Sequence, residues 1–183
     1  MSIIESFGQL SAVKRGIGAV TAVLALGWIS AIGATVTAAE GEQAQLASQL
    51  KGVPVSLAQG LAASRSQGTP ISGKFEVEDG KLQLSVYTDK SGKFAEVIVD
   101  HKTGKIAKTE PITEGDDLSH AKAQSEAMAK AKRSLEAAAG EAVKENQGYQ
   151  VVSIMPTLKD GHPVADVTLL KGTEWKTVSE KLD

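Results

Sequence analysis

The chain contains no cysteine, few aromatic residues and almost no net charge among its 183 residues, and each shortage excludes a class of protein. Without cysteine there is no disulfide framework, no thiolate nucleophile and no zinc–thiolate site. A formal net charge of −2 leaves no basic excess with which to bind nucleic acid by counterion release. We therefore expect no nucleic-acid partner, and the length allows one or two domains.

Charged residues are also missing from the long stretch between Arg15 and Glu40. This stretch is rich in Ala, Val, Ile, Leu and Gly, and it ends in small residues. A cationic start, an apolar middle and a small-residue end are the order of a secretory signal peptide. We therefore expect residues 1–39 to be a signal peptide and the remainder to be periplasmic or otherwise extracytoplasmic. The alternative is an uncleaved membrane anchor, because an uncharged run over residues 17–36 can span a bilayer.

Two segments after residue 52 each combine a helical pattern with a series of strands. Ser56 and Gln59 form a capping-box pattern at the start of the first predicted helix, and alternating apolar residues between 74 and 112 predict strands. A second helix is predicted for residues 119–143, because apolar residues recur there every seven positions. Strands follow again between residues 149 and 182.

The order helix, strand, turn, strand, turn, strand thus occurs twice. An offset of 69 residues between the copies places Leu82 over Val151 and Gly92 over Gly161. We predict an α+β fold of two tandem units, at residues 53–114 and 118–183, each with one helix on a three- to four-stranded antiparallel sheet. A unit of this size buries only about 60% of its unfolded surface, so we expect the two units to pack together.

The stretch SVYTDKSGKFAEVIVDHKTGKI, residues 85–106, resembles the PepSY domain family, in which a Val-Asp-x-x-Thr-Gly-Lys segment is characteristic. The resemblance covers residues 53–112 and is looser over 119–183, where Leu170 takes the place of Asp100. It implies a small α+β module of secreted or membrane-attached bacterial proteins and of some metallopeptidase propeptides. It also implies a non-catalytic role in binding, inhibition or regulation, and it names no ligand.

Asp100, followed by His101 and a Lys-Thr-Gly sequence, is the segment that most resembles a reaction centre. In phosphorylated ATPases the lysine directly follows the aspartate, and those enzymes need a large nucleotide-binding body. A turn requires less, because an aspartate can accept bonds from amides two residues on and Gly104 can adopt a positive φ. The sequence therefore predicts that Asp100 closes a hairpin.

No catalytic, cofactor or metal site is predicted from the remaining polar residues. His101, His120 and His162 fall in separate turn or cap positions without metal-ligand spacing. A soft-metal site formed by His162 and Met155 is a weak alternative to a polar hairpin turn. Asp116 and Asp117 precede Ser119, and we interpret them as a helix cap that matches the helix dipole.

Three aromatic residues on predicted strands, Tyr87, Tyr149 and Trp175, are candidate protein-interaction residues, because Tyr and Trp are frequent at binding hot spots. The other interpretation is that they cap the edge of a small core. The sequence thus favours an exported, non-catalytic PepSY-type module that binds a protein or peptide in the periplasm or at the membrane, such as a peptidase that it inhibits or regulates. The alternative is a membrane-anchored accessory subunit that faces the periplasm, and a metal-dependent enzyme is the least favoured class.

Overall fold

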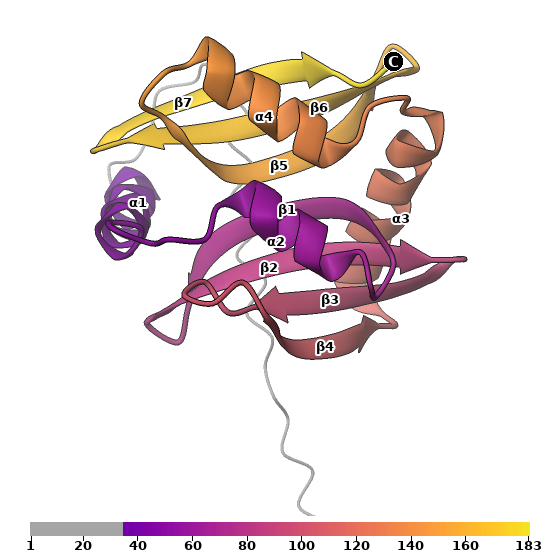
Figure 1. Cartoon of the computed structure of the whole chain (residues 1–183), viewed down its shortest axis with the longest axis horizontal. Helices are drawn as coiled ribbons and strands as arrows, with labels where there is room; N and C mark the ends of the chain where they lie inside the picture. The colour runs from indigo at the N-terminus through magenta and orange to yellow at the C-terminus, as the bar shows by residue number, and fades with distance from the viewer. Residues whose placement is uncertain (1–34) are drawn as a thin grey trace, which may run out of the picture.

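The computed structural model describes residues 35–183, and the fold is α+β, with four helices and one seven-stranded antiparallel sheet (Figure 1). The strand order is β4-β3-β2-β1-β5-β6-β7. The elements are α1 (Thr35–Gln49), α2 (Leu57–Ser64), β1 (Thr69–Glu78), β2 (Lys81–Lys90), β3 (Lys93–Val99), β4 (Ile106–Ile112), α3 (Gly115–Lys130), α4 (Leu135–Glu145), β5 (Gln150–Lys159), β6 (His162–Lys171) and β7 (Glu174–Lys181).

The predicted signal peptide or anchor falls almost wholly outside the described residues. The structure begins at residue 35, so the apolar run and its alternative as an anchor over 17–36 stay predictions. Within residues 35–183, no helix combines the length and the apolar character needed to cross a bilayer.

Helices α2 and α4 lie side by side over one face of the sheet, which we call the inner face (Figure 1). The predicted alternation is confirmed there, because every second strand residue points into the core. Leu84 and Val86 of β2 are fully buried, and so are Val167 and Leu169 of β6. Burial of side chains of this size contributes roughly 1.5–3 kcal/mol each, so this layer is the main source of stability.

Small residues allow α2 to approach the sheet closely. Ser56 caps the helix by accepting a bond from the Gln59 amide, and the Gln59 side chain accepts one from the Ser56 amide, so the predicted capping box is confirmed. A Cβ on Gly60 would lie 2.6 Å from Leu84 Cδ2. The glycine therefore sets how near the helix can lie to β2.

The two predicted units do not form two sheets. Strand β1 of the first pairs with β5 of the second, so both contribute to one continuous sheet and one core cluster. The reason is physical: each half ends in an open strand edge, and pairing those edges satisfies backbone groups while it extends the buried inner face. The sequence does not predict the β1–β5 pairing, because a strand has the same alternation of apolar and polar residues at the edge of a sheet and at its centre.

The two halves repeat with an offset of 81 residues, and the offset of 69 was wrong. The Asp79–Gly80 turn corresponds to Asp160–Gly161, and the aspartate of each adopts a positive φ. The β1–β2 register matches the β5–β6 register position by position, including the irregularity between Pro70 and Ser72, which recurs between Val151 and Ser153. The shorter offset had aligned the second turn of the first half with the first turn of the second half.

A pseudo-twofold axis relates the halves. Gly73 and Ile154, which lie 81 residues apart and are therefore equivalent, pair directly with each other across the β1–β5 seam. The same rotation exchanges α2 with α4, and α1 with α3 at opposite ends of the sheet (Figure 1). Strand β4 alone has no counterpart among the described residues.

The second predicted helix is broken, which corrects the prediction of one helix over 119–143. Helix α3 ends at Lys130, and Ser134 caps α4 by accepting a bond from the Ala137 amide. Between them, the amides of Lys132 and Arg133 donate to the carbonyl of Leu182 at 2.6 and 3.0 Å. Because this partner lies at the far end of the chain, the seven-residue pattern gave no sign of the break.

Candidate interaction surface

The face of the sheet opposite α2 and α4, which we call the outer face, is more polar and more exposed than the inner face. On β3, Val97 and Val99 of the inner face are buried, whereas Glu96 and Ile98 of the outer face are partly exposed. Ser85 and Leu170 are buried exceptions, whereas most outer-face positions on the other strands are partly or fully exposed. They include Lys74, Glu76, Gln83, Tyr87, Phe94, Lys108, Glu110, Val164, Asp166, Thr168, Thr177 and Ser179.

Charged side chains on the first half of this face are arranged in short-range pairs. Lys74 and Glu76 are 2.6 Å apart, and Lys108 and Glu110 are 2.7 Å apart. Glu96 accepts a bond of 2.5 Å from the Ser85 hydroxyl. Burial, with a smaller contribution from the charge of Glu76, raises the pKa of Glu96. A partner on this face would therefore meet alternating charges around a half-buried carboxylate.

Helix α3 covers the middle of the outer face and is held there by polar bonds. The hydroxyl of Tyr87 donates to Asp117 at 2.8 Å, and that of Ser72 donates to Gln124 at 2.8 Å. Ser125 donates to Asp89 at 2.6 Å. The bonds come from β1 and β2 of the first half, so α3 joins the second half to the first.

The three aromatic candidates do not share one surface. Tyr87 lies beneath α3, where burial and then the bond to Asp117 raise its pKa. Trp175 points to the outer face of β7 opposite Leu170, and Tyr149 lies before β5, with the Lys171 ammonium 5.6 Å from its ring centre. All three are partly buried, and Tyr149 and Trp175 pack against the core cluster.

The predicted turn at Asp100 is confirmed. Its carboxylate accepts bonds from the amides of Lys102 and Thr103 at 2.9 and 2.8 Å. Gly104 adopts a φ of 71°. Bonds from the Thr103 and Lys102 amides lower the pKa of Asp100. Both lone-pair directions of one carboxylate oxygen are thus used by the β3–β4 turn.

The histidines lie apart from one another, as their sequence positions indicated. His101 follows the end of β3, His120 is exposed on α3, and His162 lies 3.0 Å from Asp183 at the start of β6. Within residues 35–183, no group of three or more His, Asp or Glu side chains is placed to hold a metal ion.

The second helix begins about one turn earlier than predicted, so the acidic pair lies inside it and not before it. Helix α3 begins at Gly115, so Asp116 and Asp117 lie in its first turn and Ser119 lies inside it, where it donates to Gly115. The match to the helix dipole holds, because both carboxylates lie near the free amides. Sequence reasoning missed the bond from Tyr87 to Asp117, which joins residues 30 apart.

An open hollow of about 530 Å³ lies at the end of the molecule where the two halves meet. Arg65 and Glu136 cross it with an ion pair of 2.8 Å, and Lys90 and Met128 contribute to its wall. The ion pair links the end of α2 with the start of α4. It therefore joins the two halves.

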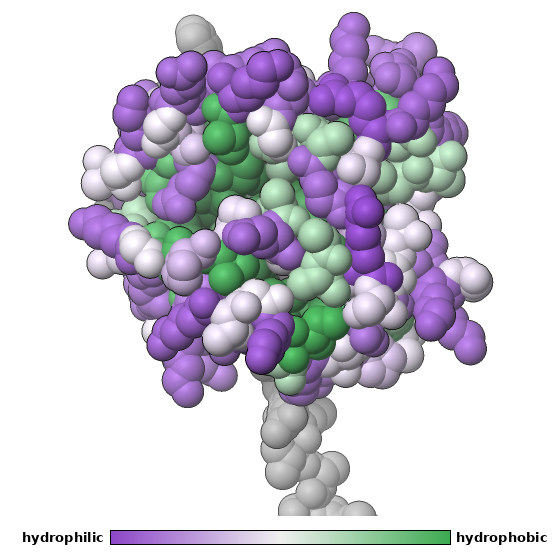
Figure 2. Space-filling view, in the orientation of Figure 1, coloured by the Kyte–Doolittle hydropathy of each residue, from purple (hydrophilic) through white to green (hydrophobic). Residues whose placement is uncertain are grey.

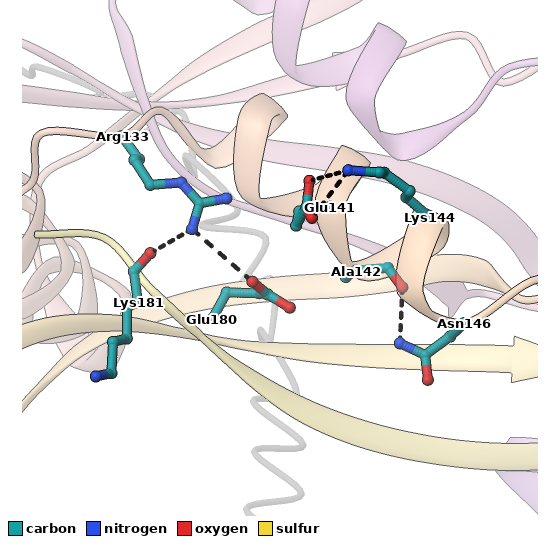
Figure 3. Close-up of polar contacts among 7 residues, drawn as sticks. All are labelled: Arg133, Glu141, Ala142, Lys144, Asn146, Glu180 and Lys181. Atoms are coloured by element: carbon teal, nitrogen blue, oxygen red, sulfur yellow. Dashed lines mark hydrogen bonds and ion pairs between the residues drawn. The ribbon is translucent and has the colours of Figure 1, made fainter.

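A second polar cluster lies between α4 and β7 (Figure 3). Glu180 of β7 is 8% exposed and forms a long ion pair with Arg133, whose Nη1 lies 3.9 Å from the Glu180 Oε2. Arg133 also donates to the Lys181 carbonyl at 2.9 Å. On α4, Lys144 pairs with Glu141 at 3.3 Å. One feature of the sequence points to this site: Glu180 has the same strand phase as the apolar residues Val178 and Leu182.

The helix side of the molecule presents polar side chains with hydrophobic patches between them (Figure 2). Among the described residues, Val143 of α4 is the exposed large hydrophobic side chain, at 37% exposure.

No protein-family model, curated protein or solved structure matches the chain. The resemblance to the PepSY family over residues 53–112 accordingly stays a prediction from the residues alone.

Proposed function

We propose that the protein is an exported, non-catalytic PepSY-type module that binds another protein or peptide in the periplasm or at the membrane. In this proposal the two halves are copies of one unit fused into a single sheet. A peptidase held inhibited or regulated is the partner class that the resemblance favours. The signal-like segment 1–39 supports export.

The observation that carries the proposal is the contrast between the two faces of the sheet. On β3 and β6, inner-face side chains such as Val97 and Val167 are buried under α2 and α4, whereas most outer-face side chains keep part of their surface in solvent. The edge strands β4 and β7 are largely exposed on both faces. The rigid strand surface that α3 leaves uncovered, with its paired charges, suits recognition by shape and charge complementarity or by strand addition.

Site-specific photocrosslinking in the native cell tests this proposal. A photoreactive residue at Ile98 or Thr177, on the outer face, is expected to give one discrete crosslinked partner. The same residue at Ala62 of α2 or Gly140 of α4, both exposed on the helix side, is the matched control and should give none. Crosslinks from the helix positions alone, or no crosslink at any position, would contradict the proposal.

The second candidate is a membrane-anchored accessory subunit that retains residues 17–36. It is favoured by the uncharged length of that run. Sequencing the N-terminus of protein isolated from its own cell separates the two. A start at Ala39 or Glu40 supports the exported module, and a start at Met1 or Ser2 supports the anchored subunit.

A further inference from the structure

Strand β7 offers an open edge where the other half of the molecule carries an additional strand. The β6–β7 register repeats the β2–β3 register with the 81-residue offset, so β7 is the equivalent of β3. The far edge of β3 is occupied by β4 in antiparallel pairing, from Phe94↔Ile112 to Val99↔Ile106. Among residues 35–183, no strand pairs with the far edge of β7. The outer edge of β3 is therefore paired with a strand, whereas the equivalent edge of β7 is unpaired within the described residues.

The side chains beneath the two edges differ in a way that indicates the chemistry of an occupant. Val99 faces the core at 1% exposure, and Glu180 holds the equivalent position at 8% exposure. A carboxylate with so little exposure and one long ion pair, to Arg133 at 3.9 Å, is less favourable than the valine at the equivalent position of the first half. Local rules are broken in this way most often at functional sites.

The surroundings of Glu180 are short of available positive charge. The pKa of Glu180 is raised by burial and by the charges of Glu145 and Glu141, against a lowering by Arg133. The neighbouring cations already have partners. These are Arg133 on the Lys181 carbonyl and Lys144 on Glu141 (Figure 3), together with Lys176 on Asn146 at 2.5 Å.

We propose that β7 accepts an extended basic segment of a partner protein as an antiparallel eighth strand, with a Lys or Arg side chain of that segment placed against Glu180, Glu141 and Glu145. The backbone of the segment pairs with the free edge, as β4 pairs with β3. Side chains alternate along a strand, so its inward positions lie over the space between β7 and α4. An inward cation there adds a second charge partner to the long ion pair that Glu180 forms with Arg133. This inference rests on the proposed binding function and assigns its partner class and contact edge.

The experiment uses the full chain and two labelled eight-residue peptides, (Lys-Thr)₄ and its charge-reversed match (Glu-Thr)₄. Fluorescence anisotropy measures binding at low ionic strength, and hydrogen exchange measures protection of edge amides. We expect (Lys-Thr)₄ to bind, (Glu-Thr)₄ not to bind, and exchange to slow in β7 but not in β4. Glu180→Gln should weaken binding about tenfold, the loss expected for one partly buried charge pair.

Two variants control for charge and folding. Glu110→Gln removes a carboxylate from the other edge strand, β4, and should leave binding unchanged. Glu180→Val introduces the residue type of the first half, so it should fold at least as stably as the wild type and still lose binding.

Equal weakening by Glu110→Gln and Glu180→Gln, protection in β4, or no binding of (Lys-Thr)₄ would overturn the inference. Any of these results combined with outer-face crosslinks in the cell would leave the proposed function standing with a different contact edge. Absence of crosslinks would instead count against the proposed function itself.

Discussion

Single polar side chains in this protein determine where its turns and helices begin. Asp100 holds two amides of the β3–β4 turn, Ser56 and Ser134 cap two helices, and Tyr87 holds α3. Each of these side chains is bonded within the protein, so its chemistry is already used structurally. Glu180 differs because it is 8% exposed and its contact with Arg133 is a long ion pair of 3.9 Å.

Replacing Asp100 tests the turn. Asp100→Ala should lower the free energy of unfolding at neutral pH, because the amides of Lys102 and Thr103 lose their acceptor. Bonds to the charged form lower the pKa of Asp100 in the folded state, so its contribution is present above the unfolded pKa of about 3.9 and disappears as the pH falls through the folded value. Urea unfolding of wild type and variant as a function of pH measures the difference. Asp100→Asn, which keeps the acceptor oxygen, should retain most of the stability at pH 7.

Replacing Glu180 tests the cost of its burial. Glu180→Val should raise the free energy of unfolding by about 1 kcal/mol at pH 7, because a desolvated carboxylate is exchanged for an apolar group. Since the folded pKa of Glu180 is raised, wild type should gain stability as the pH falls through that value toward the unfolded pKa of about 4.3. The gap between the two proteins should therefore narrow on acidification. A variant less stable than wild type at pH 7 would show that Glu180 supports the fold.

At the scale of the element, α2 and α4 are equivalent helices with equivalent caps. Each begins after a serine whose hydroxyl accepts the amide three residues on, at 3.3 Å for Ser56 and 3.2 Å for Ser134. They differ in what precedes them: Ser56 follows a loop, whereas Ser134 interrupts a run that reads as one helix. The cap of α4 therefore has the additional role of restarting the helix after the bonds to Leu182.

The two caps give a matched pair of variants. Ser56→Ala and Ser134→Ala should each cost about 1 kcal/mol, because each leaves a helix-terminal amide without its acceptor. Chemical denaturation followed by circular dichroism measures both. Ser56→Asp and Ser134→Asp, which restore a capping oxygen, should recover most of the loss. If Ser56→Asp recovers the lost stability and Ser134→Asp does not, the loss at position 134 comes from the α3–α4 connection and not from the missing cap.

At the scale of the whole molecule, the β1–β5 seam makes two similar halves one cooperative unit. The seam places Gly73 against Ile154 on the pseudo-twofold axis, and the Leu61 side chain of α2 lies 3.2 Å from where a Cβ on Gly73 would stand. The ion pair of Arg65 with Glu136 and the bonds of α3 to β1 and β2 also cross between the halves. A partner that binds either edge therefore meets a rigid platform.

Truncating a buried side chain at the β1–β5 seam tests this cooperativity. Ile154 is fully buried, so Ile154→Ala should cost about 2–5 kcal/mol through lost burial and a residual cavity. Hydrogen exchange of β2 and β6 amides should show the same loss in both halves, because both belong to one core. Thr177→Ala, exposed on β7, is the control and should change stability by less than about 0.5 kcal/mol. Loss of protection in β6 alone would show that the halves unfold separately.

Local patterns in the sequence determined the strands, the cap at Ser56, the turn at Asp100 and the inner-face phase of Leu84 and Val86. These features depend on neighbouring residues, whose spacing the sequence displays directly. The tertiary structure alone decided that two sheets merge into one, that the predicted helix breaks before Ser134, and that Glu180 is buried at an open edge. Each of these depends on partners far along the chain, and neither strand alternation nor helical spacing encodes which edge meets which.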